Sequence, residues 1–275
     1  MILSKIKKHI FLFLVRLKQK KTITQLLAQR NPLLTIIVES FLQLKYNKLS
    51  TTDTETFEAC EKYRSQLLKD DTVVSFEIFG SAKTMLVKDI CKKAASKPIW
   101  AQFLFLITKR LLRPNFLEIG TNLGVSGTYI LEALKHKKNS KLYTMEGLPQ
   151  LCKIAQNQFS KVSINSKYKI YQGLYKNTFS KLLMDNNNFN IVFIDGNHKK
   201  EPTIKYFSDL QSKLSSPAII IFDDINWSLD MQKVWRIVKS NKNISYSIDM
   251  FKFGILIFDK KKVNKKVDYK LHLAY

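Results

Sequence analysis

Three carboxylates and a histidine follow two apolar segments in the second half of the chain. The segment Asn190–Asp195 continues into Gly196-Asn197-His198, and Ala218–Phe222 is followed by Asp223-Asp224. If both segments are parallel strands of one sheet, their carboxyl ends bring these side chains to the same edge. Clustered carboxylates repel one another unless one is protonated or a hard cation such as Mg²⁺ or Ca²⁺ lies between them. Asp195, Asp223 and Asp224 are therefore predicted metal ligands.

His198 is the candidate general base of this cluster, and Asp195 is the candidate catalytic carboxylate beside it. An imidazole can accept a proton near neutral pH. The pattern leaves a metal-assisted mechanism and a metal-free mechanism with His198 as base both open. A structural alternative is that Asp195 and Asp223 cap turns or helices and His198 is an ordinary loop residue.

A second candidate site lies where the segment Phe116–Gly120 runs into the turn Thr121-Asn122-Leu123-Gly124. Gly120 and Gly124 allow a ligand to approach the backbone where a Cβ would block it. Glu118 supplies a negative charge that can hold the positive end of an amino-acid-like ligand, and it would repel a pyrophosphate, which argues against NAD. An ordinary strand-to-helix turn is the alternative, because two glycines at this spacing are a weak signal.

Glu146 ends the next apolar segment, Leu142–Glu146. In nucleotide-binding sheets an acid at this place accepts hydrogen bonds from the ribose hydroxyls. The alternative is a solvent-exposed glutamate at a strand end. Together with Glu118 and the glycine turn, Glu146 predicts a nucleoside-containing ligand that has a positively charged end.

The elements that must position these residues alternate between short apolar strands and helical segments after Pro114, which is typical of a parallel α/β sheet. Two final strands are separated only by a short turn, so they must form an antiparallel hairpin. We expect a helical extension over residues 1–110, an α/β domain over 111–260 with a mostly parallel seven-stranded sheet, and a basic tail over 261–275. The predicted strands are 116–120, 142–146, 168–172, 190–195, 218–222, 245–250 and 253–259.

Within about residues 76–258, the chain resembles bacterial class I S-adenosylmethionine-dependent methyltransferases related to catechol O-methyltransferase. The resemblance rests on FLEIGTNLGVSGTYI, YTMEG, VFIDGNHKKEPTIKYFSDL and IIIFDDINWSLDMQKVW. It implies a Rossmann-like fold, S-adenosylmethionine as the cofactor, and methyl transfer to an oxygen of a small molecule. It also implies cofactor contact at Gly120, Thr121, Gly124, Ser126 and Glu146, and the full predicted set adds Glu118, Asn122, Gly147, Gly173 and Asp195.

The same resemblance extends to the carboxylate cluster. The catechol O-methyltransferase type has a metal-binding aspartate that matches Asp195 and an Asp-Asn pair that matches Asp223-Asp224, so the second member here departs to aspartate. Its catalytic lysine matches His198. Many relatives contact the adenine through an acid after the third strand. Because Gly173-Leu174-Tyr175 stands there in this chain, we expect adenine to be held by backbone and packing.

Two further segments border the predicted site. Phe79-Gly80-Ser81-Ala82 is either an active-site lid or a simple connection. Trp227 is either a wall of an aromatic pocket or, with Met231 and Trp235 at four-residue spacing, part of the core face of a helix.

The chain is strongly basic, with 46 Lys and Arg against 22 Asp and Glu and a formal charge of +24. The lysines are spread along the chain, which favours a role in solubility over nucleic-acid binding. Residues 1–21 hold seven cations and no acid, with apolar residues at helical spacing. This pattern predicts a basic amphipathic helix that lies either on anionic lipid or on the body of the protein. Three widely spaced cysteines favour a reducing compartment, so we expect a cytoplasmic location, with peripheral contact at the inner membrane face as the alternative.

The leading hypothesis is therefore an O-methyltransferase that acts on a small molecule such as a sugar, a phenol or a lipid-linked intermediate. An RNA methyltransferase is the second hypothesis, motivated by the charge. A third is an inactive protein that keeps the fold and docks through its basic N-terminal helix.

Overall fold

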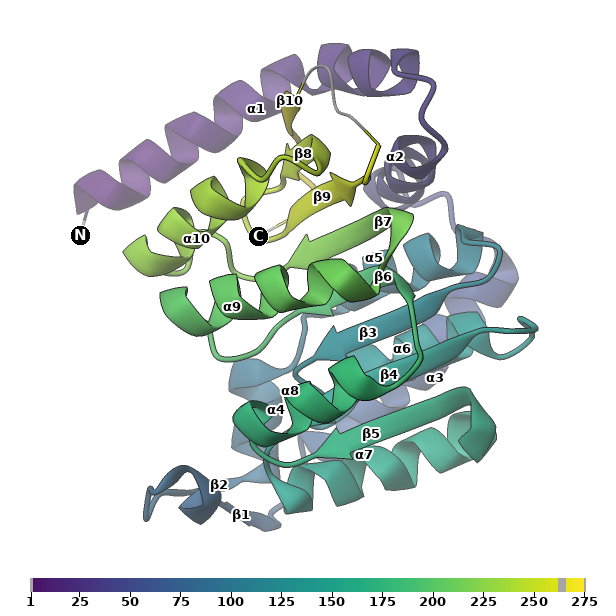
Figure 1. Ribbon diagram of the computed structural model, residues 1–275, viewed down its shortest axis with the longest axis vertical. Helices are drawn as coiled ribbons and strands as arrows, with labels where there is room; N and C mark the ends of the chain where they lie inside the picture. Colours follow the sequence, from purple (N-terminus) through teal and green to yellow (C-terminus); the bar gives the residue numbers. More distant parts are fainter. Residues whose placement is uncertain (1, 262–265, 275) are drawn as a thin grey trace.

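The computed structural model describes residues 2–261 and 266–274, with side chains from residue 9 onward, and is built on an eight-stranded sheet (Figure 1). The strand order is β10-β8-β9-β7-β6-β3-β4-β5. The strands β3 to β7 are parallel to one another, whereas β9 is antiparallel to both of its neighbours, β7 and β8. The bounds are β3 Asn115–Ile119, β4 Lys141–Glu146, β5 Tyr168–Gln172, β6 Phe189–Ile194, β7 Leu214–Phe222, β8 Ile244–Asp249, β9 Gly254–Phe258 and β10 Val267–Lys270.

The five parallel strands and the terminal hairpin confirm the predicted Rossmann-like methyltransferase architecture. The count of seven strands is too low by one, because β10 pairs in parallel with the outer strand of the hairpin. The prediction of a basic tail over 261–275 is accordingly wrong for Val267–Lys270, after which Leu271 and Leu273 are buried. The short apolar alternation of this strand is hidden among lysines. Residues 262–265 and 275 of the predicted tail lie outside the described residues.

Helices cover both faces of the sheet. In Figure 1, α9 and α10 lie in front of the sheet and α5 and α6 lie behind it. Alternate strand residues face the two sides: Phe116 and Ile191 join the core with α5 and α6, whereas Leu117 and Val192 join the core with α8, α9 and α10. This period of two is what a sheet buried on both faces requires. The helices are α5 Pro98–Arg110, α6 Val125–Leu134, α7 Pro149–Val162, α8 Tyr175–Met184, α9 Lys200–Leu210 and α10 Leu229–Lys239.

The first 110 residues are mostly helical, as expected, but they do not form a separate core. Residues of α2 and α5 belong to the same buried cluster as one face of the sheet, and the ring of Trp100 lies 4.5 Å from that of Phe253 between centroids. A small antiparallel hairpin interrupts the helices. The elements are α1 Ile2–Ala28, α2 Pro32–Lys45, α3 Thr51–Leu67, β1 Val73–Ser75, β2 Thr84–Leu86 and α4 Val87–Ala94.

The helix starts follow local sequence signals. Asn31 caps α2 by accepting from two backbone N–H groups, with Pro32 at the first helical position. Ser50 and Ser228 cap α3 and α10 by accepting from one backbone N–H group each. In the part of the chain that the structure covers, no helix has both the length and the apolarity to cross a bilayer.

Candidate active site

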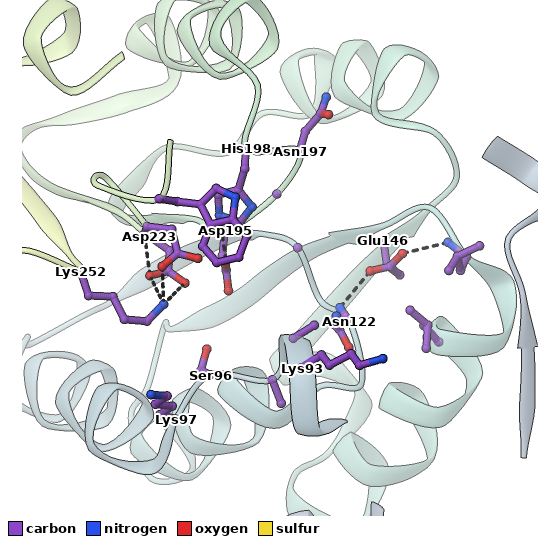
Figure 2. A pocket seen from close by; sticks show the side chains of 18 of the residues that line it. Lys93, Ser96, Lys97, Asn122, Glu146, Asp195, Asn197, His198, Asp223 and Lys252 are labelled. Carbon is purple, nitrogen blue, oxygen red and sulfur yellow. Dashed lines mark hydrogen bonds and ion pairs between the residues drawn. The ribbon is translucent and has the colours of Figure 1, made fainter. Parts of the chain in front are cut away.

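A cavity of about 850 Å³ opens where the parallel strands end (Figure 2). This volume is in the range of small-molecule and cofactor sites. Glu146 and Asn122 lie on one side of it, and Asp195, Asp223 and His198 lie on the other. The two sites predicted from the sequence are therefore two walls of one cavity.

The glycine turn after β3 connects the two walls. Gly120 has φ +115°, and a Cβ there would lie 2.5 Å from the carbonyl oxygen of Asp195. Only glycine allows β3 and β6 to end so close together. Asn122, also in the left-handed region with φ 48°, donates its backbone N–H to Glu146 Oε2 at 2.9 Å.

Glu146 is fixed by backbone donors and still faces the cavity. Its Oε2 accepts from Asn122 N and its Oε1 accepts from Leu148 N, both at 2.9 Å. Burial raises the pKa of this carboxyl, and the backbone donors oppose the shift. A carboxylate offers about four lone-pair sites, so acceptor capacity remains for two ribose hydroxyls.

Glu118 lies behind the cavity wall, and this corrects the prediction that it holds the ligand's positive end. Its side chain has no exposed surface, and it accepts from Ser126 Oγ at 2.5 Å and from Thr144 Oγ1 at 2.7 Å. Burial raises its pKa to about 7. The alternation of β3 turns this side chain toward α6, so Glu118 positions the first turn of that helix.

Some of the other residues predicted to contact the cofactor line the cavity, and the rest are buried behind it and hold its turns in place. Gly120, Asn122, Glu146 and Asp195 line the cavity, whereas Thr121 and Ser126 are buried behind it. The remaining predicted glycines hold the turns in place: a Cβ on Gly124 would lie 2.9 Å from Ala155 Cβ, a Cβ on Gly147 would lie 2.8 Å from the Phe79 ring, and Gly173 donates its N–H to the Glu146 carbonyl at 2.8 Å.

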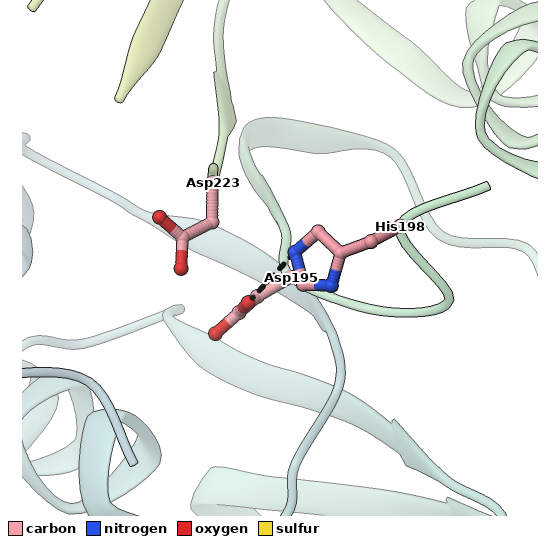
Figure 3. Close-up of side chains that lie close together, drawn as sticks. All are labelled: Asp195, His198 and Asp223. Carbon is pink, nitrogen blue, oxygen red and sulfur yellow. Dashed lines mark ion pairs between the residues drawn. The ribbon is translucent and has the colours of Figure 1, made fainter. Parts of the chain in front are cut away.

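On the opposite wall, Asp195, His198 and Asp223 come together (Figure 3). One potential ligand atom from each lies within 4.8 Å of the others. His198 Nε2 lies 3.5 Å from Asp195 Oδ1, and this buried atom makes no hydrogen bond with a described residue. An imidazole nitrogen in this state can receive a proton from a bound hydroxyl.

The predicted three-aspartate set is not what the structure assembles. Asp224 has φ 50°, and its carboxylate pairs with Lys252, while His198 takes the third place beside Asp195 and Asp223. The predicted carboxyl ends of these two strands agree with β6 and β7 to within one residue. The side-chain direction of the residue after Asp223 depends on the left-handed turn that follows β7.

Lys252 is the residue that the sequence interpretation missed. It lies in the turn between β8 and β9, and its Nζ is 2.8 Å from Asp223 Oδ1 and 2.8 Å from Asp224 Oδ1. Burial and the charge of Asp223 raise the pKa of Asp195 well above its usual range. Burial also raises the pKa of Asp223, although the Lys252 ammonium opposes this shift.

Left-handed backbone conformations gather around the cavity. Of the eight described non-glycine residues with positive φ, five line it. Such conformations are unfavourable for L-residues and persist at functional sites because the surroundings enforce them. The five are Asn122, Asn197, His198, Asp224 and Phe251.

The rim of the cavity is aromatic and basic. Phe79, from the segment considered as a lid, lines the cavity and lies against Gly147. Trp227 also lines it and is 75% exposed, whereas Met231 and Trp235 are buried, so only the last two belong to the core face of a helix. Lys93 and Lys97 add positive charge to the rim.

Comparisons with known proteins agree with this site. A family model described as a methyltransferase domain matches residues 117–225. The chain is 28% identical to a catechol O-methyltransferase from Niastella koreensis over 173 residues, which cover 62% of this chain and 73% of that protein.

Two solved structures share the fold. An O-methyltransferase from Bacillus cereus in complex with S-adenosylhomocysteine is 19% identical with a TM-score of 0.52, covering 61% of this chain and 84% of that one. A methyltransferase from Podospora anserina bound to S-adenosylhomocysteine is 15% identical with a TM-score of 0.53, covering 74% and 96%. These structures show that the chain has the fold of known methyltransferases, and the methyltransferase domain match covers the part of the chain that forms both walls of the cavity.

Proposed function

We propose that the protein transfers a methyl group from S-adenosylmethionine to an oxygen of a small molecule. The observation that carries this proposal is that Glu146 and His198 lie on opposite walls of one cavity. One wall offers a carboxylate for a ribose, and the other offers an imidazole nitrogen that makes no hydrogen bond with a described residue and can face an acceptor hydroxyl. The match to a catechol O-methyltransferase supports oxygen as the acceptor atom.

The cofactor, when bound, supplies a methyl group on a positively charged sulfur. Glu146 would accept from the ribose, and Gly120 would let the ligand lie against the backbone. His198 Nε2 would take the proton of the acceptor hydroxyl. Methyl transfer is an in-line displacement, so holding both reactants at fixed positions contributes much of the rate.

The rim favours an anionic small molecule as the acceptor. Lys93 and Lys97 are exposed and line the cavity, so they would attract a carboxylate or phosphate at its mouth. RNA is the second acceptor class, supported by the net charge of +24. RNA binding would weaken steeply with salt because counterions are released when phosphates are neutralised.

Ligand-induced stabilisation tests the cofactor assignment. S-adenosylhomocysteine at a hundredfold excess over its dissociation constant should stabilise the protein by about 2.7 kcal/mol, and NAD should not. Incubation with methyl-labelled donor and a cell extract, with and without ribonuclease, then identifies the acceptor class. Label in the small-molecule fraction supports the proposal, and label that disappears with ribonuclease favours RNA. Failure to bind S-adenosylhomocysteine would refute the enzyme assignment.

We also propose that α1 contacts an anionic membrane surface. Ile10, Phe13, Leu14 and Leu17 are spaced along one face of α1 and are between 49% and 65% exposed. The opposite face, with Leu12, Val15 and Leu26, is buried against the protein. An exposed apolar stripe among lysines suits the headgroup region of anionic lipid.

Vesicle co-sedimentation tests this contact. The protein should bind vesicles with about one third phosphatidylglycerol and not neutral phosphatidylcholine vesicles, since lysines near the surface add to binding only when the lipid is anionic. A double change of Phe13→Ser and Leu17→Ser should abolish binding. Leu112→Ser is the control, because Leu112 is 83% exposed but lies outside α1. Equal binding by the double variant would exclude this stripe as the contact.

A further inference from the structure

The site predicted for a divalent metal ion already contains a cation. Lys252 Nζ lies 2.8 Å and 3.0 Å from the two carboxylate oxygens of Asp223 and 2.8 Å from Asp224 Oδ1. Figure 2 shows the lysine side chain extended toward Asp223. The ammonium therefore lies between the two groups that were predicted to share a metal ion.

The position of this ammonium is set by an ordered turn. Met250 N donates to the Phe253 carbonyl at 2.8 Å, and Ile225 N donates to the Lys252 carbonyl at 3.1 Å. Asn226 Nδ2 donates to the Phe251 carbonyl at 2.8 Å. The loop after β7 and the turn of the terminal hairpin thus hold each other, and the lysine side chain is only 20% exposed. Lys252 is a built part of the cavity wall, unlike the lysines of the surface.

The ammonium competes with a divalent ion for the same carboxylates. Both oxygens of Asp223 and one oxygen of Asp224 are engaged by Nζ. Asp195 and His198 remain, whereas Mg²⁺ requires near-octahedral coordination by oxygen. A divalent ion beside Asp223 would also lie within a few ångströms of a like charge, and such repulsion is strong in a partly buried site. The residues present do not fit the metal that the family resemblance implies.

We propose that the Lys252 ammonium takes the place of a divalent metal ion here, so that methyl transfer by this protein is metal-independent. This inference rests on the proposed O-methyltransferase function. An ammonium has three N–H donors. Lys252 Nζ donates hydrogen bonds to Asp223 Oδ2 and Asp224 Oδ1, and its third N–H can turn from Asp223 Oδ1 to the acceptor oxygen. As the oxygen–carbon bond forms, the carbon–sulfur bond breaks, the sulfonium becomes a neutral thioether, and the hydroxyl proton passes to His198 Nε2.

Titration with Mn²⁺, without any acceptor, tests the proposal. The protein should show no saturable binding, whereas Lys252→Met should gain it and lose it again when Asp223→Asn is added. Lys252→Arg keeps the charge and should not bind Mn²⁺. Lys239→Met is the matched control, because Lys239 pairs with Asp268 at 2.8 Å outside the cavity. Turnover should persist in chelator, and Lys252→Met should lower kcat by about 10²-fold, as expected for loss of a donor to the reacting oxygen.

Several outcomes would overturn the inference. Saturable Mn²⁺ binding by the unmodified protein that Asp223→Asn removes would show that a metal ion displaces the lysine. A folded Lys252→Met protein that gains no Mn²⁺ binding would show that the ammonium is not what excludes the metal. If Lys252→Met does not fold, the unmodified protein and Lys252→Arg still decide the question. Binding of S-adenosylhomocysteine in the same samples tests the proposed function separately.

Discussion

The two walls of the cavity satisfy their charged groups in different ways. On the cofactor wall, Glu146 is held by backbone N–H groups from neighbouring turns. On the acceptor wall, Asp223 and Asp224 depend on a lysine from a distant hairpin, and His198 Nε2 is buried with no hydrogen-bond partner among the described residues. Because backbone N–H groups hold Glu146, the cofactor wall is already in position before a ligand binds. On the acceptor wall, His198 can accept a proton from a hydroxyl group that binds beside it.

His198→Ala should have the largest effect, and the effect should be confined to the acceptor wall. A general base contributes about 10²–10⁴-fold, so kcat should fall by that order while affinity for S-adenosylhomocysteine is unchanged. His136→Ala, at an exposed position, is the control. An unchanged kcat would place the base elsewhere, with Lys199 and Lys200 as the next candidates.

Gly120→Ala should damage both walls at once, because this glycine lies where they meet. The new Cβ would overlap the Asp195 carbonyl oxygen at 2.5 Å, and φ +115° is strained for alanine. Strain and overlap together should lower the free energy of unfolding by about 2–5 kcal/mol, measured by denaturant titration.

Gly80→Ala separates these two contributions. Gly80 also has a positive φ, of +71°, but there is open space around its Cβ position. It should lose only about 1–2 kcal/mol from the backbone conformation. Equal losses in the two variants would show that close approach of the walls at Gly120 is unimportant.

Glu118→Gln should change stability with pH and leave the chemistry intact. Burial raises the pKa of Glu118 from 4.5 to about 7. Between these two pH values the carboxyl is therefore protonated in the folded state and ionised in the unfolded state. The stabilisation from this proton is fully present below about pH 4.5, declines as the pH rises to about 7, and does not change further above that. The free energy of unfolding changes by up to about 3 kcal/mol over this range. The neutral glutamine should therefore raise the melting temperature at pH 8 relative to the unmodified protein more than at pH 5. The same difference at both pH values would contradict this assignment.

Glu146→Ala should weaken ligand binding, and the effect should be confined to the cofactor wall. Loss of hydrogen bonds from ribose hydroxyls to a charged acceptor costs about 1.5–3 kcal/mol, which corresponds to an affinity for S-adenosylhomocysteine that is about 10- to 150-fold weaker by calorimetry. Glu132→Ala removes a carboxylate that pairs with Lys135 at 3.6 Å outside the cavity and should leave affinity unchanged. If both variants bind equally well, Glu146 does not hold the ribose.

The sequence by itself determined the strand ends and hence most of the cavity. Apolar segments with acids at their carboxyl ends predict that Glu146, Asp195, Asp223 and His198 meet at one edge, because parallel strands of one sheet end together. Local periodicity carries this information. The short turn between the last two strands likewise predicted the antiparallel hairpin.

Only the tertiary structure decided which charges meet. Lys252 is one of 46 basic residues and has no local signal, since its role depends on a turn that folds against the loop after β7. Glu118 carries the expected charge, but the alternation of β3 buries it against Ser126 and Thr144. Strand β10 was not predicted because it is a short edge strand among lysines, so its alternation of apolar and polar residues is too brief to be recognised. Side-chain direction and long-range pairing follow from packing, and the sequence pattern does not encode them locally.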